Sequence, residues 1–515
     1  MMWCTLLAII FTVLEVKCAK ENVTNRKLNV LLMLADDAGF EINAYGNKIC
    51  QTPNLNRLSK DSLIFNYAFT SVSSCSPSRA ALLTGKPSHQ NGMFGLHQAE
   101  NHFNSFDKIK SLPKILKQHG IKTGIIGKKH VGPESVFPFD FAETEENHSI
   151  LQVGRNITLM KLLTRRFLNE TGDSPFFLYI GFHDPHRCGH TQPQFGQFCE
   201  HFGNGDTGMG LIPDWHPIYY QPEQVQLPYY LPNTWETRVD VAAQYTTMSR
   251  LDQGVGLILK ELQDSGHLND TLIIFTSDNG IPFPNGRTNL YDSGIQEPLF
   301  ISSPLHKERK GQVTSSLASH LDIMPTILDW YGIDKKQMVE DNEINGHDLL
   351  GRSLLDLLIE EPKDKSKEAV YASHNLHEVT MYYPMRMVRT HQYKLIHNIN
   401  YYSPFPIDQD FYISPTFQDL LNRTKTHQNL YWFKTLEQYY KRPEWELFDL
   451  KHDPEELNNI VKKNTSQEIF KILKNELMNW QKATSDPWLC APHAVLEDKG
   501  AYKNNLQCMD LDNQI

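Results

Sequence analysis

Short apolar runs that end in polar residues alternate along the chain with longer segments of helical periodicity. The first run, Leu28 to Asp37, reads LNVLLMLADD, which is typical of a buried strand of a parallel sheet followed by two carboxylates. Runs of the same character follow at 121–130, 174–186, 271–280 and 297–304. Helical patterns lie between them at 111–120, 235–266 and 318–331. This alternation predicts an α/β fold with a central, mostly parallel sheet between helices.

Polar and ionisable residues follow four of the predicted strands. In open α/β sheets the ligand site lies beyond the carboxyl ends of the strands. Any one of these segments, taken alone, reads as a solvated loop, but four of them at the same topological position favour a functional site. The residues are Asp36 and Asp37, Lys128 and His130, His183 and His186, and Asp278 and Asn279.

The pattern changes after about residue 365. Tyrosine-rich short segments, a turn-rich stretch PFPIDQDFYISP and a late amphipathic helix at 467–482 replace the alternation of strands and helices. These features predict a smaller α+β domain with an antiparallel sheet. We therefore expect a catalytic domain at 20–365 and a C-terminal domain at 366–515.

The beginning of the chain has the features of a signal peptide. An apolar run at 3–14 is followed by small residues, so we expect a signal at 1–19. No later segment reaches the roughly 20 apolar residues that a membrane-spanning helix needs. Seven N-x-S/T sequons also favour the secretory route, at Asn22, Asn147, Asn156, Asn169, Asn269, Asn422 and Asn464.

Six cysteines remain after the predicted signal. Two pairs lie close enough in sequence to form short disulfide loops in an oxidising compartment, Cys188 with Cys199 and Cys490 with Cys508. Cys50 and Cys75 are then left over. The sequence leaves open whether these two pair with each other.

The formal net charge of −10 argues against a protein that binds nucleic acid, since such proteins usually present a basic face. It leaves room for an anionic substrate, because a local basic site can oppose the net charge. The chain also has 22 histidines, and their protonation would reverse the sign of its net charge. This composition is consistent with work in an acidic compartment.

The residues at the predicted sheet edge have the chemistry of a metal-assisted transfer site. Asp36, Asp37, Asp278 and Asn279 offer only oxygen ligands, which suit Ca²⁺ or Mg²⁺ better than zinc. Positive charge from Arg79, Lys128 and His130 would complete a site for a compact tetrahedral anion. Transfer of a sulfuryl or phosphoryl group needs such a combination, since negative charge must be stabilised in the transition state.

Cys75 is the candidate nucleophile. It lies just before a predicted helix, SRAALLTG, and we expect the helix N-terminus to lower the pKa of its thiol or to favour an anion there. A buried unpaired cysteine is the alternative, because free cysteines are often simply core residues. Composition does not decide between the two.

The motif around Cys75 resembles a known family. The segments CSPSR at 75–79 and LLTG at 82–85, with two aspartates upstream, resemble the C-x-P-S-R signature of the type I sulfatases. The resemblance implies the fold that sulfatases share with alkaline phosphatase. It also implies that a formylglycine-generating enzyme oxidises Cys75 to formylglycine during export, so that an aldehyde hydrate and not a thiol is the nucleophile.

The resemblance also implies a role for each site residue. One calcium ion per chain would be held by Asp36, Asp37, modified Cys75, Asp278 and Asn279. Arg79 would steady the hydrate. The sulfuryl oxygens would be held by Lys128, His130 and Arg287, although many sulfatases have a lysine near the place of Arg287. His186 would be the acid for the leaving group, with His183 structural and Cys50 a free thiol.

Further segments of the chain indicate the substrate. They include TGIIGKKHVGPE, FHDPHRCGH, EVTMYYPMR and PFPIDQDFYISPTFQDLLNRT, the last two of which lie outside the general signature. They resemble lysosomal family members that remove N-linked sulfate from terminal N-sulfoglucosamine of heparan sulfate, and the family's habit indicates a homodimer. The alternatives are an O-sulfatase of the same family, a phosphodiesterase or phosphonate hydrolase of the wider superfamily, and a non-catalytic glycosaminoglycan-binding relative.

Overall fold

A computed structural model of the 515-residue chain describes residues 28–39, 41–147, 153–189, 195–334, 350–503 and 505–510. The predicted signal peptide and the sequon at Asn22 lie outside the described residues. None of the helices within these ranges is both long and apolar enough to cross a membrane.

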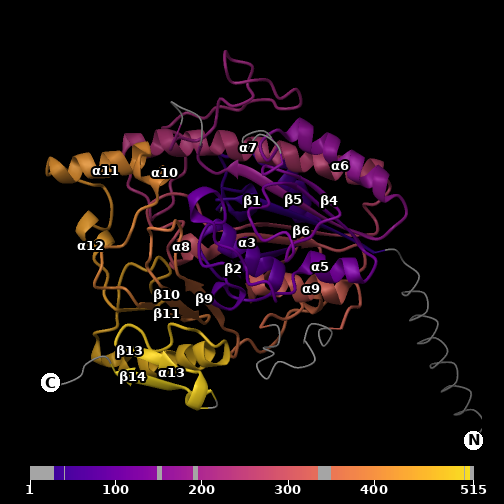
Figure 1. Cartoon of the computed structure of the whole chain (residues 1–515). Coiled ribbons are helices and arrows are strands. Elements are labelled where there is room, and N and C mark those ends of the chain that lie inside the picture. The colour runs from indigo at the N-terminus through magenta and orange to yellow at the C-terminus, as the bar shows by residue number, and fades with distance from the viewer. Residues whose placement is uncertain are drawn as a thin grey trace, which may run out of the picture.

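An eight-stranded sheet forms the centre of the larger part of the molecule (Figure 1). Five neighbouring strands on one side of it are parallel to one another, whereas β7 runs antiparallel to both of its neighbours. All five predicted strand segments are found in this sheet, which confirms the predicted fold class. In spatial order the strands are β4 (Phe141–Thr144), β3 (Lys122–Gly127), β5 (Phe176–Pro185), β1 (Asn29–Asp36), β6 (Thr271–Ser277), β7 (Gln296–Ser302), β2 (Leu63–Phe69) and β8 (Val313–Ser319).

Alternate residues of the fully buried strand β1 face two separate hydrophobic cores. Val30, Leu32 and Leu34 pack on one face of the sheet, and Leu31 and Met33 pack on the other. Helices cover both faces, as expected for parallel strands that read as continuous apolar runs. The first core includes α3 (Cys75–Thr84), α5 (Leu112–Gln118) and α9 (Ile323–Trp330), and the second includes α2 (Pro53–Lys60), α6 (Ile157–Thr171) and α7 (Trp235–Asp264).

One predicted helix starts later than expected. The sequence predicted a helix at 318–331, but β8 continues to Ser319 and α9 begins only at Ile323. Ser319 and Asp322 form a capping box that starts the helical turn between them. The apolar pair Leu317 and Ala318 fits a buried strand as well as a helix, so periodicity alone placed this boundary wrongly.

A four-stranded antiparallel sheet forms the centre of the C-terminal part, and α13 (Gln467–Ala483) packs against one of its faces. The other face packs against Phe69, Leu290 and Tyr291 of the larger part. The predicted antiparallel sheet and late helix are therefore present. The strands are β12 (Trp445–Asp449), β11 (Tyr393–Asn398), β10 (Met385–Arg389) and β9 (Val370–His374). The domain boundary at 365/366 stays a prediction.

The described chain also contains smaller helices and strands. Figure 1 shows α10 and α11 near α7, above the C-terminal sheet. These elements are α4 (Ser88–Asn91), α8 (Asp292–Ile295), α10 (Gln409–Tyr412), α11 (Pro415–Lys425), α12 (Leu436–Tyr440), and the hairpin strands β13 (Ala494–Glu497) and β14 (Gln507–Asp510).

The cysteines resolve the question that the sequence left open. Both short-range disulfides form, between Cys188 and Cys199 and between Cys490 and Cys508. Cys50 and Cys75 are both free and buried, so they do not pair with each other. Cys75 is thus a buried cysteine that no disulfide consumes.

Candidate active site

Two neighbouring parallel strands bring the predicted oxygen ligands together. Ala35 of β1 pairs in register with Ser277 of β6, so the residues that follow each strand emerge side by side. Asp36, Asp37, Asp278 and Asn279 are all 0% exposed. Asp37 has a φ of 62°, and its backbone N–H donates to Asp278 Oδ1 over 3.1 Å. This left-handed turn places consecutive carboxylates at one point, an arrangement that costs backbone strain and is typical of functional sites.

The helix α3 begins at the site with Cys75. The side chain of Ser74 does not cap this helix but bonds to His377 Nδ1 over 2.9 Å. Cys75 Sγ lies 3.9 Å from Asp37 Oδ1. All ten residues of α3 are buried, and the helix ends at Gly85, whose φ of 62° allows a left-handed cap. The start of the helix is therefore fixed by the core, with Cys75 aimed at the carboxylates.

Arg79 and Lys128 bind the carboxylates from two sides. Arg79 is 0% exposed and donates from Nε to Asp278 Oδ2 over 2.9 Å, while its Nη2 lies 3.3 Å from Asp36 Oδ1. Lys128 follows β3, and its Nζ lies 2.5 Å from Asp36 Oδ2. Arg79 also donates to the Lys128 carbonyl and to Tyr179 Oη. Both cations are thereby held at the sheet edge where the sequence predicted them.

The pKa values of the three site aspartates shift in different directions, so positive charge is unevenly distributed among them. Burial by itself would raise the pKa of Asp36, but Lys128 and neighbouring cations outweigh it and hold the pKa well below its usual value. Burial raises the pKa of Asp37 well above the usual value, although Arg287 opposes this. Burial likewise raises the pKa of Asp278 to about 6. Two of the three carboxylates therefore lack enough nearby positive charge, which a bound cation would supply.

The thiol of Cys75 does not behave as the sequence led us to expect. Burial raises its pKa well above the usual value, against the charge of Lys128, and the surrounding carboxylates raise it further. The expected lowering by the helix N-terminus is outweighed. A protonated thiol is a weak nucleophile, so Cys75 as an unmodified side chain is poorly suited to attack an anion.

Two buried side chains at the site have polar atoms without a described hydrogen-bond partner. Neither ring nitrogen of His130 has one, and nor does Asn279 Oδ1, within the ranges that the structure describes. His130 has a φ of 56°, and burial lowers the pKa of its ring well below the usual value. Leaving buried polar atoms without partners costs about 1 to 3 kcal/mol each, so such atoms point to a ligand.

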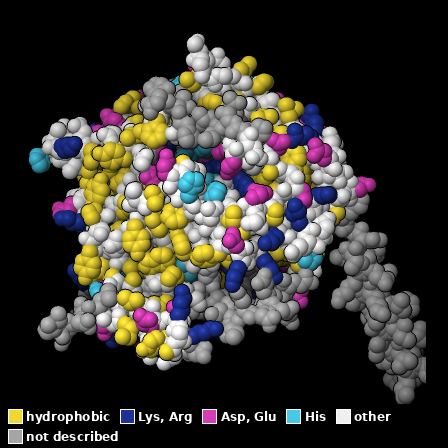
Figure 2. Space-filling model, in the orientation of Figure 1, with side chains coloured by type: hydrophobic (Ala, Val, Ile, Leu, Met, Phe, Trp, Pro, Cys, Tyr) yellow, Lys and Arg dark blue, Asp and Glu magenta, His cyan; other side chains and the backbone are white. Residues whose placement is uncertain are grey.

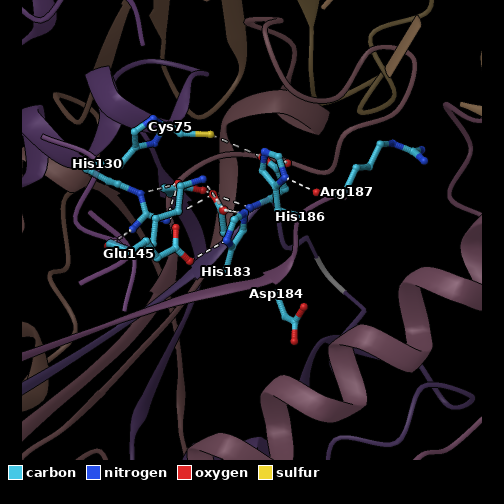
Figure 3. Close-up of polar contacts among 12 residues, drawn as sticks. Cys75, His130, Glu145, His183, Asp184, His186 and Arg187 are labelled. Carbon is cyan, nitrogen blue, oxygen red and sulfur yellow. Dashed lines mark hydrogen bonds and ion pairs between the residues drawn. The ribbon is translucent and has the colours of Figure 1, made fainter. Parts of the chain in front are cut away.

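The end of β5 supplies two histidines with different partners. His183 Nδ1 lies 2.7 Å from Glu145 Oε1, and Figure 3 shows these side chains facing one another. His186 Nδ1 bonds to the carbonyl of Arg187 over 2.7 Å. The side chains of Asp184 and Arg187 point away from this cluster in Figure 3. Both histidines turn Nε2 toward the carboxylates: His183 Nε2 lies 3.9 Å from Asp36 Oδ2, and His186 Nε2 lies 3.6 Å from Asp37 Oδ2 and contacts Arg287.

Arg287 is the predicted substrate residue with the most protein contacts. Its Nη1 donates to Asp37 Oδ2 and to His186 Nε2, the latter over 3.1 Å. Its Nε and Nη2 face two carboxylates of the C-terminal part, Asp408 and Asp410. Four of its five N–H groups are used in these hydrogen bonds, and the expected bond from Arg287 to a sulfuryl oxygen stays a prediction.

The site contains residues that the sequence did not single out. Glu145 orients His183, and burial raises the pKa of Glu145 to about 7. Asp408 and Asp410 lie in the PFPIDQDFYISP stretch, whose turn-rich composition gave no sign of a partner in another part of the chain. They are more than a hundred residues away from Arg287 in sequence, and only the structure shows that they contact it.

The donor set fits a hard divalent cation. One ligand atom from each of Asp36, Cys75 and Asp278 lies within 4.8 Å of the others, as do those of Asp37, Cys75 and His186. The carboxylates with Asn279 Oδ1 form an oxygen-rich set, which suits calcium or magnesium. Figure 2 shows histidine, acidic and basic side chains around a hollow in the middle of this face.

Comparisons with known proteins agree on one family. The family model described as Sulfatase matches residues 28–333, and the model described as N-sulphoglucosamine sulphohydrolase, C-terminal, matches 286–412 and 410–483. The chain is 58% identical over 490 residues to human N-sulphoglucosamine sulphohydrolase, covering 95% of this chain and 96% of that protein. It is 27% identical to an ulvan-active sulfatase of Formosa agariphila, covering 92% and 78%.

Solved structures share the fold. One of them, a complex with the substrate D-glucosamine-2-N,6-O-disulfate, has a TM-score of 0.62 at 21% identity and covers 90% of this chain and 99% of that one. A phosphonate monoester hydrolase of Agrobacterium radiobacter has a TM-score of 0.59 at 18% identity, covering 89% and 96%. The fold alone therefore does not separate sulfate from phosphonate chemistry.

Proposed function

The chain belongs to the sulfatase family of hydrolases, and from this premise we propose that it removes N-linked sulfate from terminal N-sulfoglucosamine of heparan sulfate. The observation that carries the proposal is the 58% identity to human N-sulphoglucosamine sulphohydrolase over almost the full length of both chains. A likeness of this extent includes the C-terminal segment that reaches Arg287, and not only the motif around Cys75.

The proposal includes the cofactors of the reaction. Asp36, Asp37, Asp278, Asn279 and the side chain at position 75 would hold one calcium ion, and the oxygen-rich donor set supports this choice. Calcium would supply positive charge for a sulfuryl oxygen, and a hydrated formylglycine at position 75 would supply a hydroxyl nucleophile. The raised pKa of the Cys75 thiol supports a nucleophile other than thiolate.

The remaining residues have roles that follow from their contacts. Arg79 and Lys128 fix the carboxylates and keep positive charge beside position 75. The one N–H of the neutral His130 ring can donate to a sulfuryl oxygen, where it would stabilise charge that grows in the transition state.

His186 would give the proton to the leaving nitrogen. A sulfamate nitrogen leaves poorly as an amide anion, so general acid catalysis is worth about 10² to 10⁴ in rate. The carbonyl of Arg187 holds His186 Nδ1, and Nε2, which accepts from Arg287 in the structure, would have to exchange this bond for a proton before it faces the reaction. Burial and the charge of Lys128 lower the pKa of His186 well below its usual value, so its protonation requires acid pH. We propose that the protein works in the lysosome after modification by a formylglycine-generating enzyme. We also propose a homodimer and the domain boundary at 365/366.

Substrate choice separates this proposal from its alternatives. The protein, secreted from eukaryotic cells, is assayed at acid pH with N-sulfoglucosamine, glucosamine 6-O-sulfate, an aryl sulfate and a phosphonate monoester. We expect sulfate release from N-sulfoglucosamine at a kcat/KM well above those for the other three. A preference for the 6-O-sulfate would instead indicate an O-sulfatase, and no turnover of any substrate would indicate a binding protein.

A further inference from the structure

The segment that carries α10 connects the C-terminal part of the chain to the active site. Asp408 caps α10, since its Oδ1 accepts the backbone N–H of Phe411 over 3.0 Å. Asp410 lies within α10, one residue after its start. Both carboxylates contact Arg287, which belongs to a loop after β6. Residues far apart in sequence thus meet at one guanidinium.

The two aspartates use their oxygens differently. Asp408 has one oxygen on the helix and the other on Arg287, 3.2 Å from Nε, and its side chain is 4% exposed. Asp410 binds Arg287 through Oδ1 only. Its Oδ2 lies 3.8 Å from His186 Nε2, and its side chain is 11% exposed. This oxygen makes no hydrogen bond to another residue of the described ranges, so it can accept one from a ligand.

The position of Asp410 places a carboxylate beside the proposed acid. His186 Nε2 faces the leaving group in the proposed reaction, and it lies 3.8 Å from Asp410 Oδ2. Arg287 connects the two, because its Nη1 donates to His186 Nε2 and its Nη2 donates to Asp410. A leaving atom that contacts His186 therefore lies within reach of Asp410 as well.

The chemistry of the leaving atom determines what such a carboxylate does. A sulfamate nitrogen has a hydrogen that can donate to a carboxylate, whereas the bridging oxygen of a sulfate ester has only lone pairs. During hydrolysis water adds an oxygen to sulfur, the sulfur–nitrogen bond breaks, and the nitrogen keeps the bonding electron pair. At acid pH the nitrogen leaves as an ammonium group by taking up protons, and sulfate is released. Positive charge therefore develops on the nitrogen as it leaves, and a nearby carboxylate stabilises that charge.

We propose that Asp410 is a specificity-determining residue that recognises the leaving nitrogen of the N-sulfated sugar and disfavours O-sulfate esters. The inference rests on the proposed function. A site built to accept a hydrogen bond from a substrate N–H rejects an analogue that lacks it, because the buried acceptor then has no partner. The same oxygen also binds the amino group of the product, glucosamine.

The test compares Asp410→Asn with the matched control Asp408→Asn. Both substitutions remove one negative charge next to Arg287, but only Asp410 has an oxygen close to His186 Nε2, where the leaving group is proposed to bind. We expect Asp410→Asn to lower kcat/KM for N-sulfoglucosamine about 10- to 100-fold, the value of a charge-assisted hydrogen bond. Turnover of an aryl sulfate should stay the same or rise. Asp408→Asn should change kcat/KM for both substrates by the same factor.

A binding measurement removes the dependence on turnover. Calorimetric titration with glucosamine should give a Kd that rises about 10-fold or more in Asp410→Asn and stays within twofold in Asp408→Asn. Equal losses for both substrates, or an unchanged glucosamine Kd, would overturn the role of Asp410. A wild-type protein that does not release sulfate from N-sulfoglucosamine would overturn the proposed function instead, and the glucosamine titration would then decide the inference alone.

Discussion

The active site and the pair Arg386–Asp486 both contain buried groups of opposite charge. In the pair, the protein itself supplies hydrogen-bond partners for these groups, whereas in the active site some polar atoms have no partner among the described residues. Arg386 Nε and Nη2 bind the two oxygens of Asp486 over 2.5 and 2.8 Å. Asp486 also accepts from Gln481 Nε2 and from the backbone of Trp488, and Arg386 Nη1 donates to two carbonyls. The pair joins β10 to the chain just after α13, and it is 0% exposed on both sides.

At the active site, charges of both signs are also buried, yet some atoms lack partners. The ring nitrogens of His130 and the Oδ1 of Asn279 have no hydrogen bond within the described ranges. Burial raises the pKa of Asp37 and Asp278, whereas Arg386 and the hydrogen bonds hold the pKa of Asp486 well below its usual value against burial. The difference teaches that buried charge alone indicates structure, and that unpartnered atoms aimed at one point indicate a ligand.

The largest expected effect comes from a substitution in the active site. Cys75→Ala should lower turnover of N-sulfoglucosamine by roughly 10⁴-fold or more, because it removes the thiol that the oxidation to formylglycine requires. The melting temperature should stay within about 2 °C, since the small side chain of Cys75 is exchanged for another small one. Steady-state kinetics and thermal melts check both statements. Retained activity would show that the reaction takes place elsewhere.

The second effect comes from a substitution in the Arg386–Asp486 pair. Asp486→Asn leaves the Arg386 guanidinium buried without its counter-charge, so we expect the free energy of unfolding to fall by about 3 to 5 kcal/mol. The kcat of the folded fraction should not change. Urea unfolding and activity at low temperature measure the two quantities. An unchanged stability would contradict the structural role of the pair.

The pH dependence gives a control for this variant. The folded-state pKa of Asp486 lies below the unfolded value of 3.8, so the pair's stabilisation is present above that pH and is lost as the pH falls below it. The stability difference between wild type and Asp486→Asn should therefore be constant at pH 5 to 7 in urea unfolding. Below about pH 3.8 it should shrink by about 1.4 kcal/mol per pH unit. A constant difference down to pH 2 would assign the loss to packing and not to charge.

The smallest effect concerns the cation. Calcium at 100 times its Kd should stabilise the folded protein by about 2.7 kcal/mol. Asp278→Asn should lose most of this gain, because it removes a carboxylate that the proposal assigns to the ion. Asp486→Asn serves as the matched control and should keep the gain. Thermal melts with and without chelator distinguish these outcomes, and an equal calcium response in all three proteins would contradict the proposed site.

The sequence predicted the large sheet because the strands are buried runs with polar residues at their carboxyl ends. It therefore placed Asp36, Lys128, His186 and Asp278 correctly at one edge. Arg79 could also be predicted, since it lies one helical turn after Cys75 in the same helix. In these cases the local sequence determines the position of the side chain.

Other features depend on contacts that no local pattern contains. Asp408 and Asp410 approach Arg287 only because the C-terminal sheet packs against Leu290 and Tyr291 of the larger part. The raised pKa of Cys75 depends on burial by several elements at once, which the position of a helix N-terminus does not reveal. Packing between distant segments therefore decides the details of the site, even where the family and the fold follow from the sequence.

Peptide mass spectrometry of the segment around Cys75 tests the central claim most directly. The protein is produced in a eukaryotic secretory pathway, and the active fraction is digested and analysed. We predict that position 75 carries an aldehyde in the active material, in proportion to its activity, while Cys50 stays an unmodified thiol. An unmodified thiol at position 75 throughout fully active protein would contradict the account.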